Sequence, residues 1–409
     1  MRKLLTPLLM ALALAAYAAP TPPKIVAKSA IVVDSVTGTI LYTKDCHARR
    51  PPASTTKMMT AILALEHGDL DEQVCASAHA CQTPNSSLHL KPGEILTLRN
   101  LLYGLLLRSG NDAAVCVAEH VAGSEPKFVQ MMNERAKELG AKDTHFVNPH
   151  GLYNAKHYSS AYDLALIARE AARYPEFNEV VRTRTAYIER SINTKDAYLR
   201  NHARFLWKFE GADGIKTGYT REAGRCFVGS ATRDGWRPIA VILKSKDAGV
   251  DASALLTYTF KYFQGYYFAK PGNKVTSLPV AGGMAEKVDL VPSDGLGIVI
   301  RKSSGDEAKT EIETRKAKAP IEKGEKLGTV TGYLNGKRVG SVDLIAAESV
   351  DRTPAATAWV WTRSFLLIGL LSLAVFITYG TAAAKAARRR RRSLASRSRK
   401  AHNVGPNRR

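Results

Sequence analysis

The sequence predicts an α+β protein in which an antiparallel sheet covered by helices is followed by a small all-β domain and one C-terminal transmembrane helix. Two strand patterns, at residues 30–44 and 226–244, flank a long stretch whose apolar residues recur at helical spacing. Residues 272–350 instead alternate in short runs typical of β-strands. Residues 364–384 are uncharged over a length that spans a bilayer. We therefore expect a first domain over residues 24–265 and a separate β domain after it.

The sheet of the first domain is predicted from two hairpins. Residues 30–44 alternate between apolar and polar side chains around Thr37-Gly38, a turn signal. The runs at residues 226–232 and 238–244 are joined through Asp234-Gly235, a dipeptide that favours a two-residue turn. Because the hairpins lie at opposite ends of the domain, the helices between them are expected to cover the sheet.

The helices are predicted from apolar spacing and from capping residues. Ser160-Ala-Tyr-Asp163 matches a capping box, and Ser124 precedes Pro126 as an N-cap residue does. In the β domain, Asn335-Gly336 is predicted to form a turn. Helices are expected near residues 58–65, 98–107, 113–123, 124–139, 161–168 and 251–262.

The chain is strongly basic, with 59 Lys and Arg against 37 Asp and Glu and a net charge of +22. Fourteen of the positive side chains lie in the terminal segments, which leaves +8 for the body from Lys24 to Ala356. A protein that binds nucleic acid through its folded domains carries its charge there. We therefore expect no nucleic-acid partner.

The N-terminus has the pattern of a secretory signal peptide. Arg2 and Lys3 precede an apolar run and the small residues of Ala16-Tyr17-Ala18, so residues 1–18 are predicted to be removed on export. A retained anchor is the alternative, but the run is short for a bilayer of about 30 Å.

The C-terminus has the pattern of a membrane anchor. Trp359 and Trp361 precede the apolar segment at residues 364–384, and residues 385–409 form a basic tail. The positive-inside rule places this tail in the cytoplasm and the body on the extracytoplasmic side of the cytoplasmic membrane. Beside a spanning helix, the expected partner of a basic tail is anionic lipid.

Five cysteines are few for an exported chain. Cys75 and Cys81 are close enough in sequence for a small disulfide loop, and the sequence leaves open whether it forms. No CxxC or HExxH pattern is present, so we expect no metal and no cofactor.

Three short motifs carry the chemistry of the first domain. In Ser54-Thr-Thr-Lys57, a hydroxyl and an amine lie one turn apart at the start of a predicted helix, within reach of a proton transfer. Ser109-Gly-Asn111 places a hydroxyl and an amide in a loop between two apolar helices. Lys216-Thr-Gly218 forms an extended segment in which the glycine permits close approach of another backbone.

Each motif is weak alone, because the chain contains two decoys. Ser124 and Lys127 repeat the first spacing, and Ser191 and Asn193 repeat the second without an apolar helix before them. The chain order of all three motifs is the specific signal, because penicillin-binding proteins and class A β-lactamases carry such a trio in this order.

With these motifs the chain resembles the serine D-Ala-D-Ala carboxypeptidases of the low-molecular-weight penicillin-binding proteins, relatives of the class A β-lactamases. Residues 24–350 carry the resemblance, which includes Asn148-Pro-His-Gly-Leu152 and Asp213-Gly-Ile-Lys-Thr-Gly-Tyr-Thr220. It implies a β-lactamase/transpeptidase-like fold. The chain departs from the family at His202-Ala203-Arg204, where relatives usually carry a second asparagine, and this affects the local loop rather than the reaction.

The resemblance implies an acyl-enzyme mechanism on peptidoglycan pentapeptide stems. Ser54 would attack the carbonyl between two D-alanines, with Lys57 as general base. Ser109 would relay a proton to the leaving amine. β-Lactam antibiotics are expected to acylate the same serine, because their ring carbonyl mimics the scissile amide.

The resemblance also implies how the substrate is held. Asn111 would hydrogen-bond the acyl part, and Lys216 with Thr217 would bind the terminal carboxylate. The backbone N–H groups of Ser54 and Tyr219 would form an oxyanion hole, and Gly218 would let the strand approach. His150 and His157 are expected to satisfy local hydrogen bonds, because a serine–lysine pair needs no histidine.

Two alternatives come from other classes of function. A weak β-lactamase would need a deacylating glutamate between the second and third motifs, and Glu170, Glu176 and Glu179 lie there only in helical patterns. A non-catalytic wall-binding scaffold would not need all three motifs intact. The sequence leaves open the preferred stem chemistry, any transpeptidase or endopeptidase activity, the role of the β domain and the oligomeric state.

Overall fold

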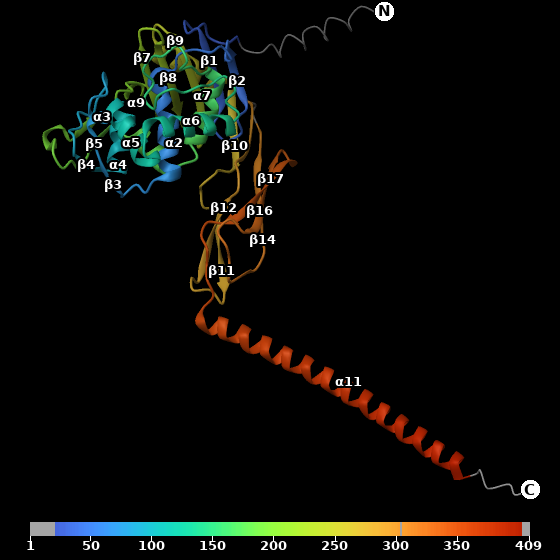
Figure 1. Cartoon of the computed structure of the whole chain (residues 1–409). Coiled ribbons are helices and arrows are strands. Elements are labelled where there is room, and N and C mark those ends of the chain that lie inside the picture. Colours follow the sequence, from blue (N-terminus) through green and yellow to red (C-terminus); the bar gives the residue numbers. More distant parts are fainter. Residues whose placement is uncertain (1–20, 303–304, 403–409) are drawn as a thin grey trace, which may run out of the picture. The chain divides into compact units, whose positions relative to one another are not determined.

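The computed structural model describes residues 21–302 and 305–402, and it has the predicted α+β domain, all-β region and C-terminal helix (Figure 1). The predicted signal peptide, residues 1–18, lies outside the described residues. The chain forms two compact units, each built from several segments. In the described residues, the first unit comprises 21–275, 291–302 with 305–314, and 328–345; the second comprises 276–290, 315–327 and 346–402.

A five-stranded antiparallel sheet is the centre of the first unit. Its strand order is β2-β1-β9-β8-β7, with β7 at one edge (Figure 1). The strands are β1 Ser29–Asp34, β2 Ile40–Lys44, β7 Ala212–Thr220, β8 Gly224–Ala231 and β9 Pro238–Ser245. Asp234 and Gly235 both have positive φ, 50° and 76°, as the predicted turn between β8 and β9 requires.

Helices cover both faces of this sheet. The side chains of β1 show this, because alternate residues of the strand pack into two different cores. Ile31 and Val33 pack into the core of the helical layer, whereas Ala30 and Val32 pack into a second core. Helix α7 (Ala161–Ala171) packs against β1 and β9, and α10 (Ala248–Tyr262) packs against β8 and β9. All six residues of β1 are therefore buried.

Helix α2 (Lys57–His67) lies within the helical layer and contacts four other helices. Its first eight residues are buried, so it is enclosed on all sides, as a helix without a polar face must be. The neighbouring helices are α4 Leu98–Leu107, α5 Asn111–Ala122, α6 Glu125–Glu138 and α7, and the shorter helices of this unit are α3 Ala78–Cys81, α8 Pro175–Arg182 and α9 Phe205–Lys208. Helix α4 spans its predicted residues, while α10 begins earlier than predicted because Asp247 caps it.

Short two-stranded sheets complete the first unit, and further strands form the all-β region. Strand β3 pairs with β4, β5 with β6, β10 with β13, and β14 with β16; in the second unit, β11 pairs with β12 and β15. Their bounds are β3 Gln73–Cys75, β4 Ile95–Thr97, β5 Thr185–Tyr187, β6 Tyr198–Arg200, β10 Phe263–Ala269, β11 Thr276–Ala281, β12 Lys287–Pro292, β13 Leu296–Arg301, β14 Ala308–Thr314, β15 Ala317–Lys318, β16 Lys326–Leu334 and β17 Lys337–Ala346. Because strands of the β region are divided between the units, the domain boundaries at residues 24–265 and 272–350 stay predictions.

Helix α11 (Pro354–His402) contains the predicted membrane segment and extends beyond it at both ends. By length and composition, its stretch Phe365–Arg392 can cross a membrane. All five cysteines are free thiols, so Cys75 and Cys81 are not joined in this structure.

Candidate active site

Ser54 and Lys57 lie where a single 3₁₀ turn, η1 (Ala53–Thr56), leads into α2. The side-chain nitrogen of Lys57, Nζ, is 3.1 Å from Ser54 Oγ, because the i, i+3 spacing places both side chains on one face. Nζ also lies 2.7 Å from Asn111 Oδ1 and 2.8 Å from the carbonyl oxygen of His150. The structure thus joins the first predicted motif to the second.

The partners of Lys57 Nζ fit both protonation states of its amine, because the ammonium form can donate to all three of them. The carbonyl oxygen of His150 can only accept a hydrogen bond, and so can Asn111 Oδ1, whose amide nitrogen donates to the carbonyl of Pro84 at 2.7 Å. A neutral amine donates two hydrogen bonds and accepts one. Once Lys57 has lost a proton, its lone pair is therefore left for the hydroxyl of Ser54, the one partner that can also donate.

Ser109 and Lys216 join the second motif to the third. Ser109 lies in the loop between α4 and α5 with φ of 64°, and Lys216 Nζ lies 3.0 Å from its Oγ. Lys216 Nζ also donates to the carbonyl of Thr217 at 3.2 Å. Asn111 was predicted in the loop but is the first residue of α5.

Strand β7 carries the third motif along the edge of the sheet, against η1. A Cβ atom at Gly218 would lie 2.9 Å from the backbone nitrogen of Ser54, so only glycine lets the two segments approach this closely. Thr217 is half-buried, and Tyr219 is 66% exposed. An edge strand has free backbone groups with which an extended peptide can pair.

Both lysines are buried, which destabilises their charged forms. Burial and the charge of Lys216 hold the pKa of Lys57 well below its ordinary value, and Asp112 opposes this only in part. Burial lowers the pKa of Lys216 to about 7. Because only Lys57 is lowered by a neighbouring cation as well, Lys57 is the amine that gives up its proton first.

A segment that the motifs did not reveal holds Asn111 in place. The backbone N–H of Asn111 donates to the carbonyl of Ser86 at 2.7 Å, and its side chain binds Pro84. Buried Asp112 accepts hydrogen bonds from the backbone N–H groups of Leu88 and Leu90 and anchors the same segment. These contacts cross more than twenty residues, and the only sequence signal was an acidic residue beside the motif.

A buried ion pair fixes the far end of this segment. Arg190 Nε lies 2.8 Å from Glu94 Oε1, and both side chains are fully buried. Arg190 also donates to the carbonyl oxygens of Leu88 and His89. Removal of one partner of such a pair typically lowers the free energy of unfolding by about 3–5 kcal/mol. Arg190 therefore stabilises the segment that holds Asn111.

Nδ1 of each of the two histidines near the site makes a local hydrogen bond, as predicted. His150 Nδ1 accepts from the backbone N–H of Leu152, and His157 Nδ1 accepts from that of Val147. At the departure from the family pattern, the backbone N–H of His202 donates to the carbonyl of Leu107, two residues before Ser109. Burial and the charges of Lys216 and Arg108 lower the pKa of His202.

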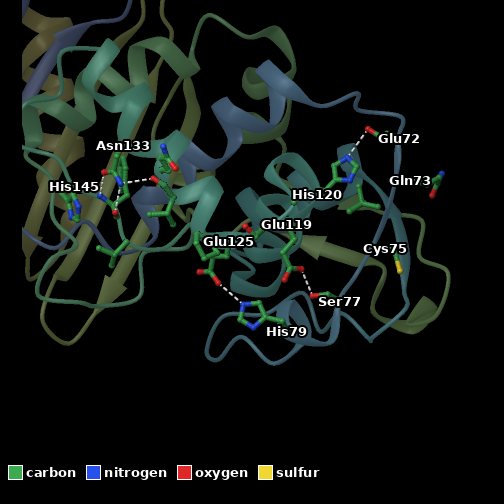
Figure 2. Close-up of a pocket in the computed structure, with 18 residues that line it drawn as sticks. Glu72, Gln73, Cys75, Ser77, His79, Glu119, His120, Glu125, Asn133 and His145 are labelled. Atoms are coloured by element: carbon green, nitrogen blue, oxygen red, sulfur yellow. Dashed lines mark hydrogen bonds and ion pairs between the residues drawn. The ribbon is translucent and has the colours of Figure 1, made fainter.

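A cleft of about 1280 Å³ in the first unit does not contain the three motifs. Figure 2 shows the pairs that line it, in which His79 binds Glu125, His120 binds Glu72 and Ser77 binds Glu119. Each of these carboxylates therefore has a partner within the cleft. In the described part of the chain, no group of three or more His, Cys, Asp and Glu side chains is arranged to hold a metal ion.

The fold and the site define the class of active-site serine enzymes to which penicillin-binding proteins belong. A family model described as D-alanyl-D-alanine carboxypeptidase matches residues 16–247, and one described as penicillin-binding protein 5, C-terminal domain, matches residues 263–352. The chain belongs to the D-alanyl-D-alanine carboxypeptidase family and is a serine peptidase of peptidoglycan metabolism.

Relatives match most of the chain. D-alanyl-D-alanine carboxypeptidase DacF of Bacillus subtilis is 35% identical over 336 residues, which cover 80% of this chain and 86% of that protein. The structure of penicillin binding protein 5 from Haemophilus influenzae is 30% identical with a TM-score of 0.60, covering 82% of this chain and 100% of that one. A variant of Streptomyces K15 DD-transpeptidase is 34% identical with a TM-score of 0.56, covering 58% of this chain and 99% of that one.

Proposed function

We propose that the three motifs form one catalytic centre, in which Ser54 attacks the carbonyl between the two terminal D-alanines of a peptidoglycan stem pentapeptide. Lys57 Nζ takes the hydroxyl proton while the bond from Ser54 Oγ to the carbonyl carbon forms. The observation that carries this proposal is the set of Nζ partners: two of them only accept hydrogen bonds, so a deprotonated Lys57 turns its lone pair toward Ser54.

The acyl-enzyme forms when the carbon–nitrogen bond breaks and terminal D-alanine departs. The departing amine receives, through the hydroxyl of Ser109, the proton that Lys57 took from Ser54, and Lys216 Nζ lies 3.0 Å from that hydroxyl. Water then attacks the ester and restores Ser54. The released product is one D-alanine and a stem shortened by one residue.

Substrate binding uses the edge of the sheet. The substrate pairs with β7, its terminal carboxylate binds Lys216 and Thr217, and its acyl part binds Asn111. In the described residues, no group accepts the backbone N–H of Ser54, so this donor is free for an oxyanion. The N–H of Tyr219 is the second oxyanion donor, and Gly218 keeps the strand close to Ser54.

β-Lactams are expected to acylate Ser54, which gives a direct test of the nucleophile. Mass spectrometry of the purified protein after incubation with labelled penicillin is expected to map one adduct to Ser54. Ser54→Ala should abolish both the adduct and the release of D-alanine, a loss of at least about 10³-fold. The matched control is Ser124→Ala in the decoy motif, which should retain both; an adduct on another residue would contradict the proposal.

Two other activities remain as alternatives to hydrolysis. The Streptomyces relative is named a transpeptidase, so transfer of the acyl group to an added amine is to be compared with transfer to water. In the described residues, no carboxylate hydrogen-bonds to Ser54, Lys57, Ser109 or Lys216, which favours a lasting β-lactam adduct over β-lactamase turnover. D-Alanine release that persists in Ser54→Ala would instead support a scaffold with a contaminating activity.

We further propose that residues 1–18 are a cleaved signal peptide, that residues 24–265 and 272–350 fold as separate domains, and that α11 anchors the protein with its catalytic domain outside the cytoplasm. N-terminal sequencing of the membrane-bound protein is expected to begin at Ala19. The basic tail, residues 385–409, is expected to bind anionic lipid. A peptide of this tail should sediment with phosphatidylglycerol vesicles and not with phosphatidylcholine vesicles; equal binding to both would contradict the lipid proposal.

A further inference from the structure

The peptide unit between Ala53 and Ser54 is held in an unusual conformation. Ala53 has φ of 48°, which L-residues with a side chain seldom adopt. Glycines flank this unit, because a Cβ at Gly151 would lie 1.9 Å from the carbonyl oxygen of Ala53, and one at Gly218 would lie 2.9 Å from the nitrogen of Ser54. The surrounding structure therefore fixes this peptide closely.

Two buried side chains bind the carbonyl oxygen of this unit in series. Thr56 Oγ1 donates to the carbonyl of Ala53 at 2.9 Å, and His157 Nε2 lies 2.9 Å from the same Oγ1. Because His157 Nδ1 accepts from the N–H of Val147, the proton of the neutral ring lies on Nε2, which donates to Thr56. Thr56 is fully buried and His157 is 2% exposed, so water does not replace either bond.

This order of donors has a consequence for the opposite side of the peptide. The peptide unit is planar, and its C=O and N–H groups point in opposite directions. A bond that fixes the direction of the Ala53 carbonyl therefore also fixes the direction of the Ser54 N–H. That N–H is the donor assigned above to the oxyanion.

We propose that His157 is a positioning residue that aims the Ser54 N–H at the oxyanion through Thr56 and the carbonyl of Ala53. This inference rests on the proposed function, because it needs an oxyanion at that site. His157 does not touch the substrate. Burial lowers the pKa of His157 to about 3, so the ring keeps its donor on Nε2 throughout the neutral range.

The test compares two depsipeptide substrates that end in D-lactate and differ only in the carbonyl attacked by Ser54, which is C=O in one and C=S in the other. Sulfur is a poor hydrogen-bond acceptor, so only the C=O substrate gains fully from the oxyanion donors. The ratio of kcat/KM for the C=O substrate to kcat/KM for the C=S substrate therefore reports how well these donors point at the oxyanion. Loss of a whole oxyanion donor typically costs ~10²–10³ in kcat. In Thr56→Val and His157→Leu we expect this ratio to fall by about tenfold, because the donor is misdirected rather than absent.

Matched variants separate this role from simple packing. Thr60→Val removes a buried hydroxyl of α2 that donates to the carbonyl of Pro149 at 2.5 Å, and it should leave the ratio unchanged. His157→Gln places an amide donor near the position of Nε2, and Thr56→Ser keeps the hydroxyl, so both should restore the ratio. Thermal unfolding of each variant is to be measured, and a cooperative transition is required before its ratio is compared.

An unchanged ratio in folded Thr56→Val and His157→Leu would overturn the proposal, and so would an equal fall in Thr60→Val. Neither result would touch the proposed function, which stands or falls on D-alanine release by the wild type and on the penicillin adduct at Ser54.

Discussion

Lys57→Gln is expected to slow D-alanine release and penicillin acylation together, each by about 10³-fold or more. The amide can still donate to Asn111 Oδ1 or to the carbonyl of His150, so part of the hydrogen bonding of Nζ is kept. It cannot accept a proton from Ser54. Release of D-alanine and formation of the labelled acyl-enzyme are to be measured on the same preparation.

The pH profile distinguishes a missing base from a disturbed site. In the wild type, activity should rise with pH through the pKa of Lys57, because only the neutral amine accepts a proton. The slow reaction left in Lys57→Gln should lack this acidic limb. Lys127→Gln changes the exposed lysine of the decoy motif and should behave as the wild type. A Lys57→Gln protein that acylates at nearly the wild-type rate would show that another group is the base.

The sequence located the three motifs on the elements that bring them together, because each motif is tied to a local element. Ser54 and Lys57 share one helix start, Ser109 follows the end of α4, and Lys216 lies in a strand. Three hydrogen-bond distances from the Nζ atoms of Lys57 and Lys216 show that the motifs meet. Local periodicity was sufficient to predict the elements that bring the motifs together.

The contacts that hold the trio were not predictable in the same way. Asn111 is bound by carbonyls of Pro84 and Ser86, and the link from Thr56 to His157 spans 101 residues. Backbone carbonyls carry no sequence signal, and a long-range hydrogen bond depends on how helices and loops pack. At the decoy motif, a local pattern predicts the position of a residue correctly but not its contact. Ser124 is the N-cap residue of α6, yet its side chain makes no cap hydrogen bond.

The second large effect is expected at alkaline pH, where the affinity for substrate should fall because Lys216 loses its charge. Lys216 must be protonated to bind the substrate carboxylate. Because its pKa in the free protein is about 7, protonated Lys216 falls about tenfold for each pH unit above that value. We expect kcat/KM for a peptide ending in D-Ala-D-Ala to fall accordingly.

The bound carboxylate opposes this loss, because an opposite charge raises the pKa of Lys216 in the complex. The decline should therefore appear in KM, while kcat stays level to higher pH. Lys216→Arg keeps its charge at all these pH values, so the alkaline limb of kcat/KM should disappear even if the activity is lower. A peptide with a C-terminal amide should react poorly with the wild type and show no alkaline limb. If kcat/KM for the acid is level to pH 9, Lys216 does not bind the carboxylate as a cation that titrates near neutrality.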